Sequence, residues 1–413
     1  MEPSTPHTFE ARLVMALLIA VSLIANISMD IHLPLAPLMV EELETTPFRV
    51  QLIFIISVLL TTITPLFWGG LSDCYGRRTL LIPSCVFMSV GQFGCAVASS
   101  IQALLVARTI QYVGVGAVLT VGLAVVCDLF QAQTRARMIA LLEISIPIGL
   151  MMAPLIGAFT AQYLGWRYNF FILGVLQTAL LIVLVQTLPE TLKQKRSYSW
   201  KKSYQSIKIL MQSPDFLEPV FLLALVNTSY MIFITHASFL YIRYFHLTEL
   251  EFALHQSLMA GLYFVGLLVY RQLVKRYSLV FLLNVHMTGY IVYGIFMAFL
   301  CLDILAPSPF TITIVTLISS LVSGAILTGC SSLALGTSTT LLATRSSLIE
   351  FTMGSLGATF MLLSGWMSDQ GPSWIFGLIV ISVGASFWVW QRLLQRHSRP
   401  DVYLSPTNYD ASS

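Results

Sequence analysis

The feature that most constrains this chain is a series of long apolar segments, each close to the length that crosses a lipid bilayer. A spanning helix needs about 20 apolar residues, because the hydrocarbon core is ~30 Å thick and a helix rises ~1.5 Å per residue. Six such segments precede a polar stretch and six follow it. They lie near residues 11–38, 50–70, 79–98, 101–127, 137–163, 168–188, 217–243, 252–273, 279–302, 309–341, 347–367 and 372–391. The sequence therefore predicts an all-α membrane protein with twelve transmembrane helices in two six-helix halves.

The composition agrees with a membrane protein. Only 10% of the residues are charged and 56% are hydrophobic, whereas a soluble domain carries roughly 25% charged residues. The net charge of +3 gives no indication of a nucleic-acid partner. The six cysteines stand singly, without a CxxC pair, so we expect neither a disulfide framework nor a metal site. The first apolar segment exceeds a signal-peptide core of roughly 7–15 residues, and we interpret it as a retained membrane helix.

The basic residues predict the orientation. With both termini and the polar stretch in the cytoplasm, eighteen of the 22 Lys and Arg lie on the cytoplasmic side and three lie outside. This distribution follows the positive-inside rule. The cytoplasmic set is Arg12, Arg77, Arg78, Arg135, Arg137, Lys193, Lys195, Arg196, Lys201, Lys202, Lys208, Arg271, Lys275, Arg276, Arg345, Arg392, Arg396 and Arg399, and the external set is Arg49, Arg167 and Arg243. We expect an N-terminal half at 1–188, a basic linker at 189–215 and a C-terminal half at 216–413.

A glycine- and charge-rich loop lies between the second and third spans. It includes Gly69, Asp73, Gly76, Arg77 and Arg78 in the order G-G-L-S-D-C-Y-G-R-R. Glycine permits a tight turn, an aspartate is favourable at a helix N-terminus, and the two arginines can hold the loop at the lipid surface. With the two halves, this loop resembles the major facilitator superfamily, whose signature here is G-x-L-a-D-r-x-G-r-r.

This resemblance implies a substrate site between the halves, near the membrane midplane. It also implies that the loop acts as a gate latch, with Asp128 and Arg137 as its local partners. The expected substrate is a small molecule, and the expected partners are protons and the lipid bilayer around a monomer.

The fifth span carries Gly149, Ala153, Pro154 and Gly157 at regular spacing. Small residues four apart let two helices pack closely, and proline relaxes the helix between them. The pattern resembles the antiporter signature G-x-x-x-G-P-x-x-G-G of the same superfamily, with alanine at its second and last glycines. The resemblance implies export rather than uptake.

The first span contains the sequence M-D-I-H-L-P-L-A-P, which includes Asp30 and His32. It resembles the D-x-Y-L-P-A-x-P element of the bicyclomycin/chloramphenicol-type (Bcr/CflA) drug exporters, with His32 in place of tyrosine and Leu35 in place of alanine. The resemblance covers the first half and thins in the second. It implies a drug:proton antiporter in a bacterial inner (cytoplasmic) membrane.

Three residues are candidates for proton coupling. Asp30 is the expected proton carrier, and Arg108 is functional by default because a charge inside a membrane helix is costly. Both lie roughly 10 Å below the outer surface at ~1.5 Å per residue, so they could pair. The alternative is a structural Asp30–Arg108 pair that never titrates. Glu143, on the fifth span, is the next candidate.

Four further residues are candidates for the substrate cavity: His32, Gln111, Tyr112 and Tyr230. Gln111 and Tyr112 follow Arg108 in a pattern similar to the family's R-x-x-Q-G, with the glycine replaced by tyrosine.

The leading hypothesis is proton-driven export of small lipophilic or amphipathic molecules such as drugs. The alternative is proton-coupled import of a nutrient or metabolite on the same fold. No HExxH or GxSxG motif indicates an enzyme, and no Walker sequence indicates ATP as the energy source. We expect no cofactor.

The charge distribution yields a test of topology. A reporter fused after Ser203 should read as cytoplasmic, and one fused after Glu44 should read as external, because basic residues concentrate on the cytoplasmic side. Reporter activity in intact cells measures both fusions, and reversed readings would show that the orientation is wrong.

Overall fold

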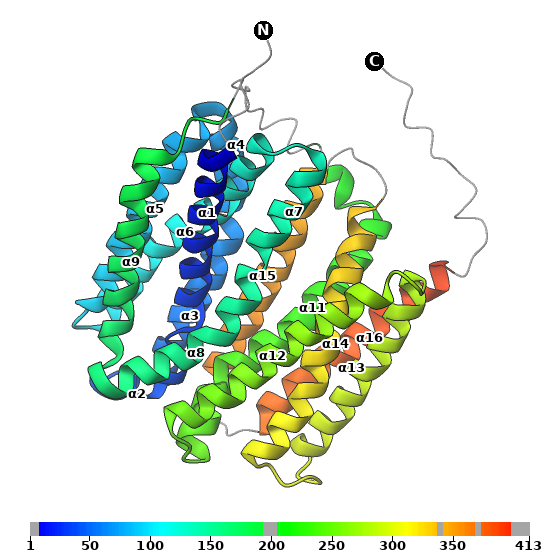
Figure 1. The fold of residues 1–413 in the computed structure, drawn as a ribbon. Coiled ribbons are helices and arrows are strands. Elements are labelled where there is room, and N and C mark those ends of the chain that lie inside the picture. The colour runs from blue at the N-terminus through cyan, green and yellow to red at the C-terminus, as the bar shows by residue number, and fades with distance from the viewer. Residues whose placement is uncertain (1–7, 193–204, 206, 337–341, 368–372, 398–413) are drawn as a thin grey trace.

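The computed structural model describes residues 8–192, 205, 207–336, 342–367 and 373–397. Every regular element in these ranges is helical (Figure 1). The elements are α1 (Thr8–Asp30), η1 (Leu33–Leu35), α2 (Ala36–Glu42), α3 (Pro47–Ile63), α4 (Pro65–Tyr75), α5 (Arg77–Ala96), α6 (Ile101–Leu129), α7 (Ala132–Glu143), α8 (Ser145–Leu164), α9 (Trp166–Thr187), α11 (Pro214–Ser238), η2 (Phe239–Tyr244), α12 (Glu249–Leu273), α13 (Leu279–Cys301), α14 (Pro309–Leu335), α15 (Leu342–Trp366) and α16 (Ser373–His397).

The predicted number of spans is confirmed. Within the described residues, eleven helices are long and apolar enough to cross a membrane, and the pair α3–α4, bent by 43°, brings the number to twelve. The tenth predicted span, 309–341, was too long, because α14 ends at Leu335 and Gly336 follows with a positive φ of 64°. Most of the basic linker, at 193–204, lies outside the described residues.

Several spans are interrupted where the sequence analysis expected continuous helices. The first span ends as α1 at Asp30 and continues through η1 and α2, each of which has a proline in its first turn. The second breaks at Thr64, immediately before Pro65. Proline lacks the amide hydrogen that would continue the helical ladder and clashes with the preceding turn. These interruptions place irregular backbone inside the bundle, where it can serve a binding site.

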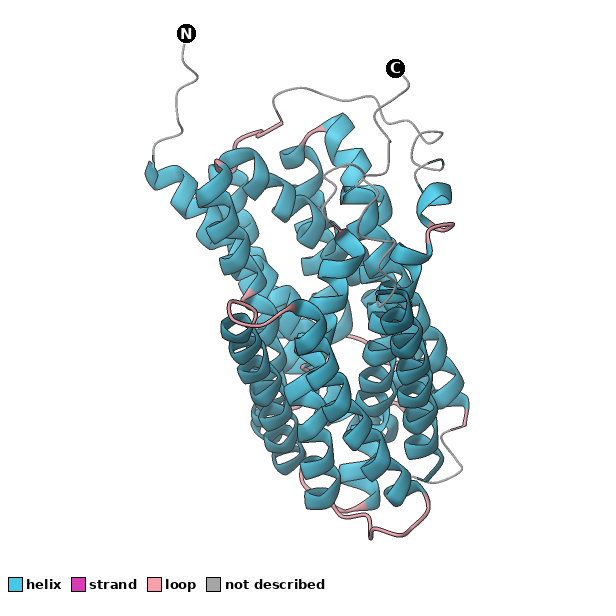
Figure 2. Ribbon diagram, turned by 90° about the vertical axis from the view of Figure 1, so that its right-hand side faces the viewer, coloured by secondary structure: helices cyan, strands magenta, loops and turns pink. Residues whose placement is uncertain are grey.

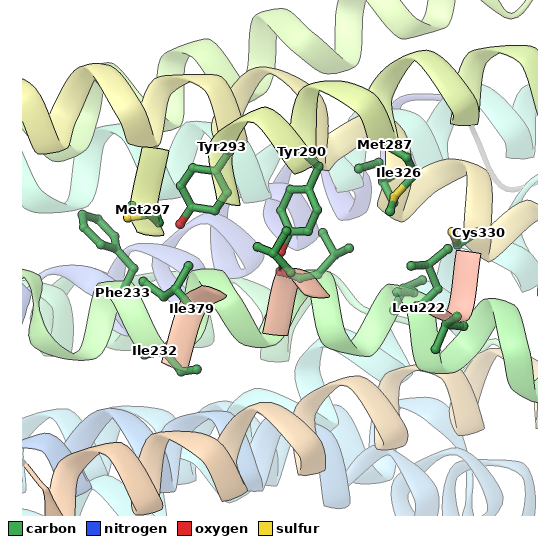
Figure 3. Close-up of a cluster of buried hydrophobic side chains, with 14 of the residues drawn as sticks. Leu222, Ile232, Phe233, Met287, Tyr290, Tyr293, Met297, Ile326, Cys330 and Ile379 are labelled. Atoms are coloured by element: carbon green, nitrogen blue, oxygen red, sulfur yellow. Dashed lines mark hydrogen bonds between the residues drawn. The ribbon is translucent and has the colours of Figure 1, made fainter. Parts of the chain in front are cut away.

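Each half has a core of its own. In the half formed by α11 to α16, apolar side chains of α11, α13, α14 and α16 meet in one cluster (Figure 3). The rings of Tyr290 and Tyr293 point from α13 toward α11, and the Tyr290 hydroxyl bonds Ser229 Oγ. In the half formed by α1 to α9, α1, α5 and α6 contribute most of the main cluster.

The two halves are bound together mainly at one end of the bundle. α1 begins and α16 ends at the terminal end, whereas α2 lies at the opposite end (Figures 1 and 2). At the opposite end, Arg243 Nη2 lies 3.2 Å from Glu41 Oε1. Deeper in the bundle, Gln51 Nε2 donates to the carbonyl of Thr235 at 3.3 Å and contacts His236 Nδ1 at 3.2 Å.

One further contact extends this network within the C-terminal half, and another joins the halves. His236 Nε2 lies 3.0 Å from Ser364 Oγ, which extends the Gln51 network from α3 through α11 to α15. Ser257 Oγ on α12 donates to the carbonyl of Met151 on α8 at 2.8 Å. In the described part of the chain, the Gln51 contacts with α11, the Ser257–Met151 bond and the Glu41–Arg243 pair thus join the halves.

The seam between α3 and α15 requires glycine. A Cβ atom at Gly354 would overlap Thr62 Oγ1, which is itself held by a hydrogen bond of 2.7 Å to the Val58 carbonyl. Nearer the opposite end, a Cβ at Gly365 would lie 2.8 Å from Gln51 Oε1. The two helices therefore approach as closely as their backbones allow.

The close packing of α3 against α15 predicts the effect of a larger residue at position 354. Gly354→Leu should lower the free energy of unfolding by about 1–3 kcal/mol, because an overpacked interface forces side chains or backbone to move. Thermal melting of the purified protein measures the change. Gly384→Leu on α16 is the matched control, since nothing lies within 4 Å of a Cβ built there. Equal melting temperatures for the two variants would contradict the close seam.

Candidate functional site

The break in the first span positions the predicted proton carrier. Asp30 is the last residue of α1, and its side chain is buried. Its Oδ2 atom has no hydrogen-bond partner among the described residues. Tyr230 of the other half is close enough for the charge of Asp30 to act on it. One oxygen of the carboxyl group is therefore without a donor among the described residues, and its charge reaches a residue of the other half.

Arg108 is fully buried on α6 and is bound to the same break. Its Nη1 atom donates to the carbonyl of Ser28 at 3.0 Å and to Gln111 Oε1 at 3.1 Å. Its Nη2 atom lies 3.2 Å from His32 Nδ1. Since arginine has donors only, His32 Nδ1 must be the acceptor. The guanidinium carbon also lies 4.8 Å from the centre of the Tyr112 ring.

The direct pairing of Asp30 with Arg108 is not present. Within the described residues, no ion pair joins them at 4.0 Å or less, although their charges act on one another. Arg108 contacts residues on both sides of Asp30 in the chain, and its guanidinium points toward His32 and the Ser28 carbonyl. The alternative of a structural Asp30–Arg108 pair therefore loses its geometric basis.

The small residues of α8 hold the break in place. A Cβ atom at Gly157 would overlap the carbonyl oxygen of Ile31, and one at Gly149 would lie 2.7 Å from the Cβ of Asn26. Ala153 is fully buried between these two glycines, beside Pro154. The pattern that resembles the antiporter signature thus packs α8 directly against α1 and its interruption.

Arg77 is the centre of the gate loop. Its Nη2 atom pairs with Asp73 Oδ1 at 2.6 Å, and its Nε atom pairs with Asp128 Oδ2 at 3.0 Å. Its Nη1 atom donates to Ser72 Oγ. All of these partners belong to the same half. These contacts of Arg77 therefore lie within its own half.

Glu190, which the sequence analysis did not select, completes this loop. The backbone N–H of Arg77 donates to its Oε1 atom at 2.8 Å, and that of Arg78 donates to its Oε2 atom at 3.2 Å. The carboxylate thereby caps the N-terminus of α5, where anions are favoured. Gly76 has a φ of 117°, and a Cβ there would overlap Glu190. The only indication in the sequence was that Glu190 is the single acidic residue of the basic stretch at 189–213.

The remaining gate and coupling candidates have fewer contacts. Arg78 Nη2 donates to the Val185 carbonyl at 2.7 Å. Gly69 packs near Thr120. Arg137 is exposed and forms no ion pair within the described residues. Glu143 ends α7, and its charge acts on Glu350 of α15 across the interior. The roles of all these residues stay predictions.

A cavity of about 180 Å³ lies between the halves. Most of the residues that line the cavity belong to α11, α12 and α14. α8 contributes two more residues, and α13 contributes Tyr293. It is lined by Ile146, Leu150, Val226, Asn227, Tyr230, Phe233, Ile234, Gln256, Met259, Ala260, Tyr263, Tyr293, Thr316, Ser319, Ser320, Ser323 and Leu327. The cavity is therefore mostly a feature of the C-terminal half.

Of the four residues predicted to line a substrate cavity, Tyr230 is among those that line this one. His32, Gln111 and Tyr112 surround Arg108 instead, and all three are buried. The sequence signal that was missed is the run of hydroxyl residues on α14, spaced at three and four residues. Among the described residues, no group of three His, Cys, Asp or Glu side chains is placed to hold a metal ion.

Comparison with known proteins identifies relatives. The model of the Major Facilitator Superfamily matches residues 18–348. The chloramphenicol resistance protein of Pseudomonas aeruginosa is 30% identical over 190 residues, which cover 46% of this chain and 45% of that protein. The niacin transporter NiaP of Acinetobacter baylyi is 30% identical over 154 residues, which cover 37% and 35%. The chain thus matches less than half of the length of these curated relatives.

The fold matches a solved transporter over nearly its whole length. A crystal structure of a bacterial homologue of the human lysosomal transporter Spinster, in an inward-facing and unoccupied conformation, has a TM-score of 0.73 at 15% identity. The match covers 95% of this chain and 100% of that one. At this identity the likeness shows the fold alone.

The cap on α5 yields a double-mutant test. Glu190→Ala should lower the free energy of unfolding by about 0.5–1 kcal/mol, because two N-terminal amides lose their acceptor. Gly76→Ala should be more destabilising in the wild-type background than in Glu190→Ala, because the added methyl overlaps the carboxylate only when Glu190 is present. Melting temperatures of the two single variants and the double variant measure the coupling. Strictly additive changes would contradict the contact.

Proposed function

The chain belongs to the major facilitator superfamily, and from that premise we propose that it exports small lipophilic or amphipathic molecules in exchange for protons. Its twelve spans make it a multi-pass integral membrane protein. Its family and its fold are those of a transporter rather than an enzyme. We propose the coupling to protons, the direction of transport and the class of substrate on the grounds that follow.

The observation that carries the proposal is the environment of Asp30. A buried carboxyl group without a hydrogen-bond donor is more stable with a proton bound than as an isolated charge. Asp30 has an unpartnered oxygen and lies at the interruption of α1, next to Tyr230 of the other half. Movement of one half against the other would change its surroundings, and so would promote uptake of a proton on one side and release on the other.

The arrangement of the halves supports an alternating mechanism. If the termini lie in the cytoplasm, the polar contacts through Glu41, Gln51 and Ser257 close the external side. The gate loop then lies on the cytoplasmic side, where Arg77 pairs with Asp73 and Asp128 of its own half. In this proposal the molecule is inward-facing and ready to receive a cytoplasmic substrate. Residues 1–188 and 216–413 would move as units about the linker in a bacterial inner membrane, as a monomer.

Export is favoured by the small residues of α8 and by the name of the chloramphenicol resistance protein. Import is the second candidate, because an equally identical relative is named as a niacin transporter. Proteoliposomes with an imposed proton gradient distinguish the two. Chloramphenicol moving against protons supports export, whereas niacin moving with protons supports import.

The proton site is tested by Asp30→Asn, which is neutral and cannot release a proton. Export of chloramphenicol should fall to background, and proton release on addition of chloramphenicol to detergent-solubilised protein should disappear. The melting temperature should stay near that of the wild type, since Arg108 has its own partners at Ser28, Gln111 and His32. A pH indicator in weak buffer measures the release.

The matched control is Asp303→Asn, which makes the same chemical change at an exposed turn between α13 and α14. It should keep both export and proton release. A folded Asp30→Asn variant that still released protons would remove Asp30 from the mechanism, and Glu143 would become the next candidate.

A further inference from the structure

The cavity has a polar wall made by regular helix faces. On α14, Thr316, Ser319, Ser320 and Ser323 line it at spacings of three and four residues. Such a spacing places side chains on one face of a helix. The opposing face on α12 includes Gln256. Hydroxyl and amide groups thus gather on the side of the cavity that belongs to the C-terminal half.

Gln256 is the one amide of this wall that is buried and lacks partners within the described residues. It is 5% exposed, and neither its Nε2 nor its Oε1 atom has a hydrogen-bond partner there. Buried side-chain amides are nearly always hydrogen-bonded, because an unmade bond is costly in a dry site. Since Gln256 lines the cavity, a ligand in the cavity could supply both a donor and an acceptor.

No charged residue is among the seventeen that line the cavity in the described part of the chain. Removing a charged ligand from water costs free energy, and no opposite charge on this wall would offset that cost. The other walls carry the aromatic rings of Tyr230, Phe233, Tyr263 and Tyr293, which suit an apolar or aromatic body. Such rings can also attract organic cations. A cation that carries no hydrogen-bond acceptor, however, would leave the donor Gln256 Nε2 without a partner.

We infer that this cavity is a binding site for neutral, aromatic-containing molecules that carry an amide-like group, and that Gln256 recognises that group through paired hydrogen bonds. A primary amide or a lactam has its N–H and its carbonyl on the same side of the C–N bond, so it can offer the N–H to Gln256 Oε1 and the carbonyl to Gln256 Nε2. A trans secondary amide presents these two groups on opposite sides. Asn227, which also lines the cavity, provides a second amide within the same wall. The inference rests on the proposed transport function and specifies its substrate class.

The competing interpretation is that Gln256 only packs between helices and binds water. Gln177 on α9 provides the comparison, because it is a fully buried amide that interacts with the Cys85 thiol and does not line the cavity. Gln177→Leu therefore removes another buried amide without altering the site.

The test is equilibrium binding to the purified full-length protein in nanodiscs, without a proton gradient and with empty nanodiscs subtracted. The probes are 3,4-dihydroisoquinolin-1-one, its N-methyl derivative and isochroman-1-one, which share their ring system and differ in the donor. Wild type should bind the lactam that carries the N–H on the order of tenfold more tightly than the other two. Gln256→Leu should abolish this preference, and Gln177→Leu should keep it. Gln256→Met is the second variant if the leucine variant does not fold.

Three results would overturn the inference: no binding of 3,4-dihydroisoquinolin-1-one to wild type, a preference that survives in the Gln256 variants, or tighter binding of tetraphenylphosphonium than of this lactam. Because no transport is measured, the inference can fail while export stands. Conversely, amide-selective binding with no proton release would count against the proposed antiport and leave the site intact.

Discussion

The hydrogen bond from Arg108 to the Ser28 carbonyl is the interaction on which the site depends. In a bilayer every backbone polar group needs a partner, and the interruption of α1 leaves carbonyls that the helical ladder no longer satisfies. Arg108 supplies a donor to that backbone and a second to His32. From the other side, Gly157 allows α8 to approach the Ile31 carbonyl. Together these contacts fix the irregular segment that carries Asp30.

This arrangement separates two tasks that a single ion pair would combine. Arg108 is stabilised by hydrogen bonds and by the ring of Tyr112, so its burial does not require the charge of Asp30. Asp30 consequently remains next to the interface between the halves without a fixed partner. A group that must change its protonation state is better placed there than in a strong pair, because a buried pair resists the loss of either member.

The interface between the halves is unequal along its length. Close backbone approach at Gly354 and the Gln51–His236–Ser364 network bind α3 to α11 and α15, whereas Arg77 of the gate loop pairs with Asp73 and Asp128 of its own half. A transporter needs such an interface to exchange its contacts from one end to the other. Tyr230 lines the cavity and also packs against the apolar cluster that α3, α11 and α15 form, so ligand binding and the relative position of the halves share this residue.

The sequence by itself determined the twelve spans, the gate loop around Arg77 and the close packing of α8, because length, hydropathy and small-residue spacing act along a single helix. Only the tertiary structure decided the partners. Arg108 contacts His32 rather than Asp30, Glu190 caps a helix 113 residues earlier in the chain, and the cavity lies on α11, α12 and α14. Depth in the membrane follows from counting residues. The direction in which a side chain points around its helix depends on how the helices pack, and apolar spans without a marked polar face leave that rotation open.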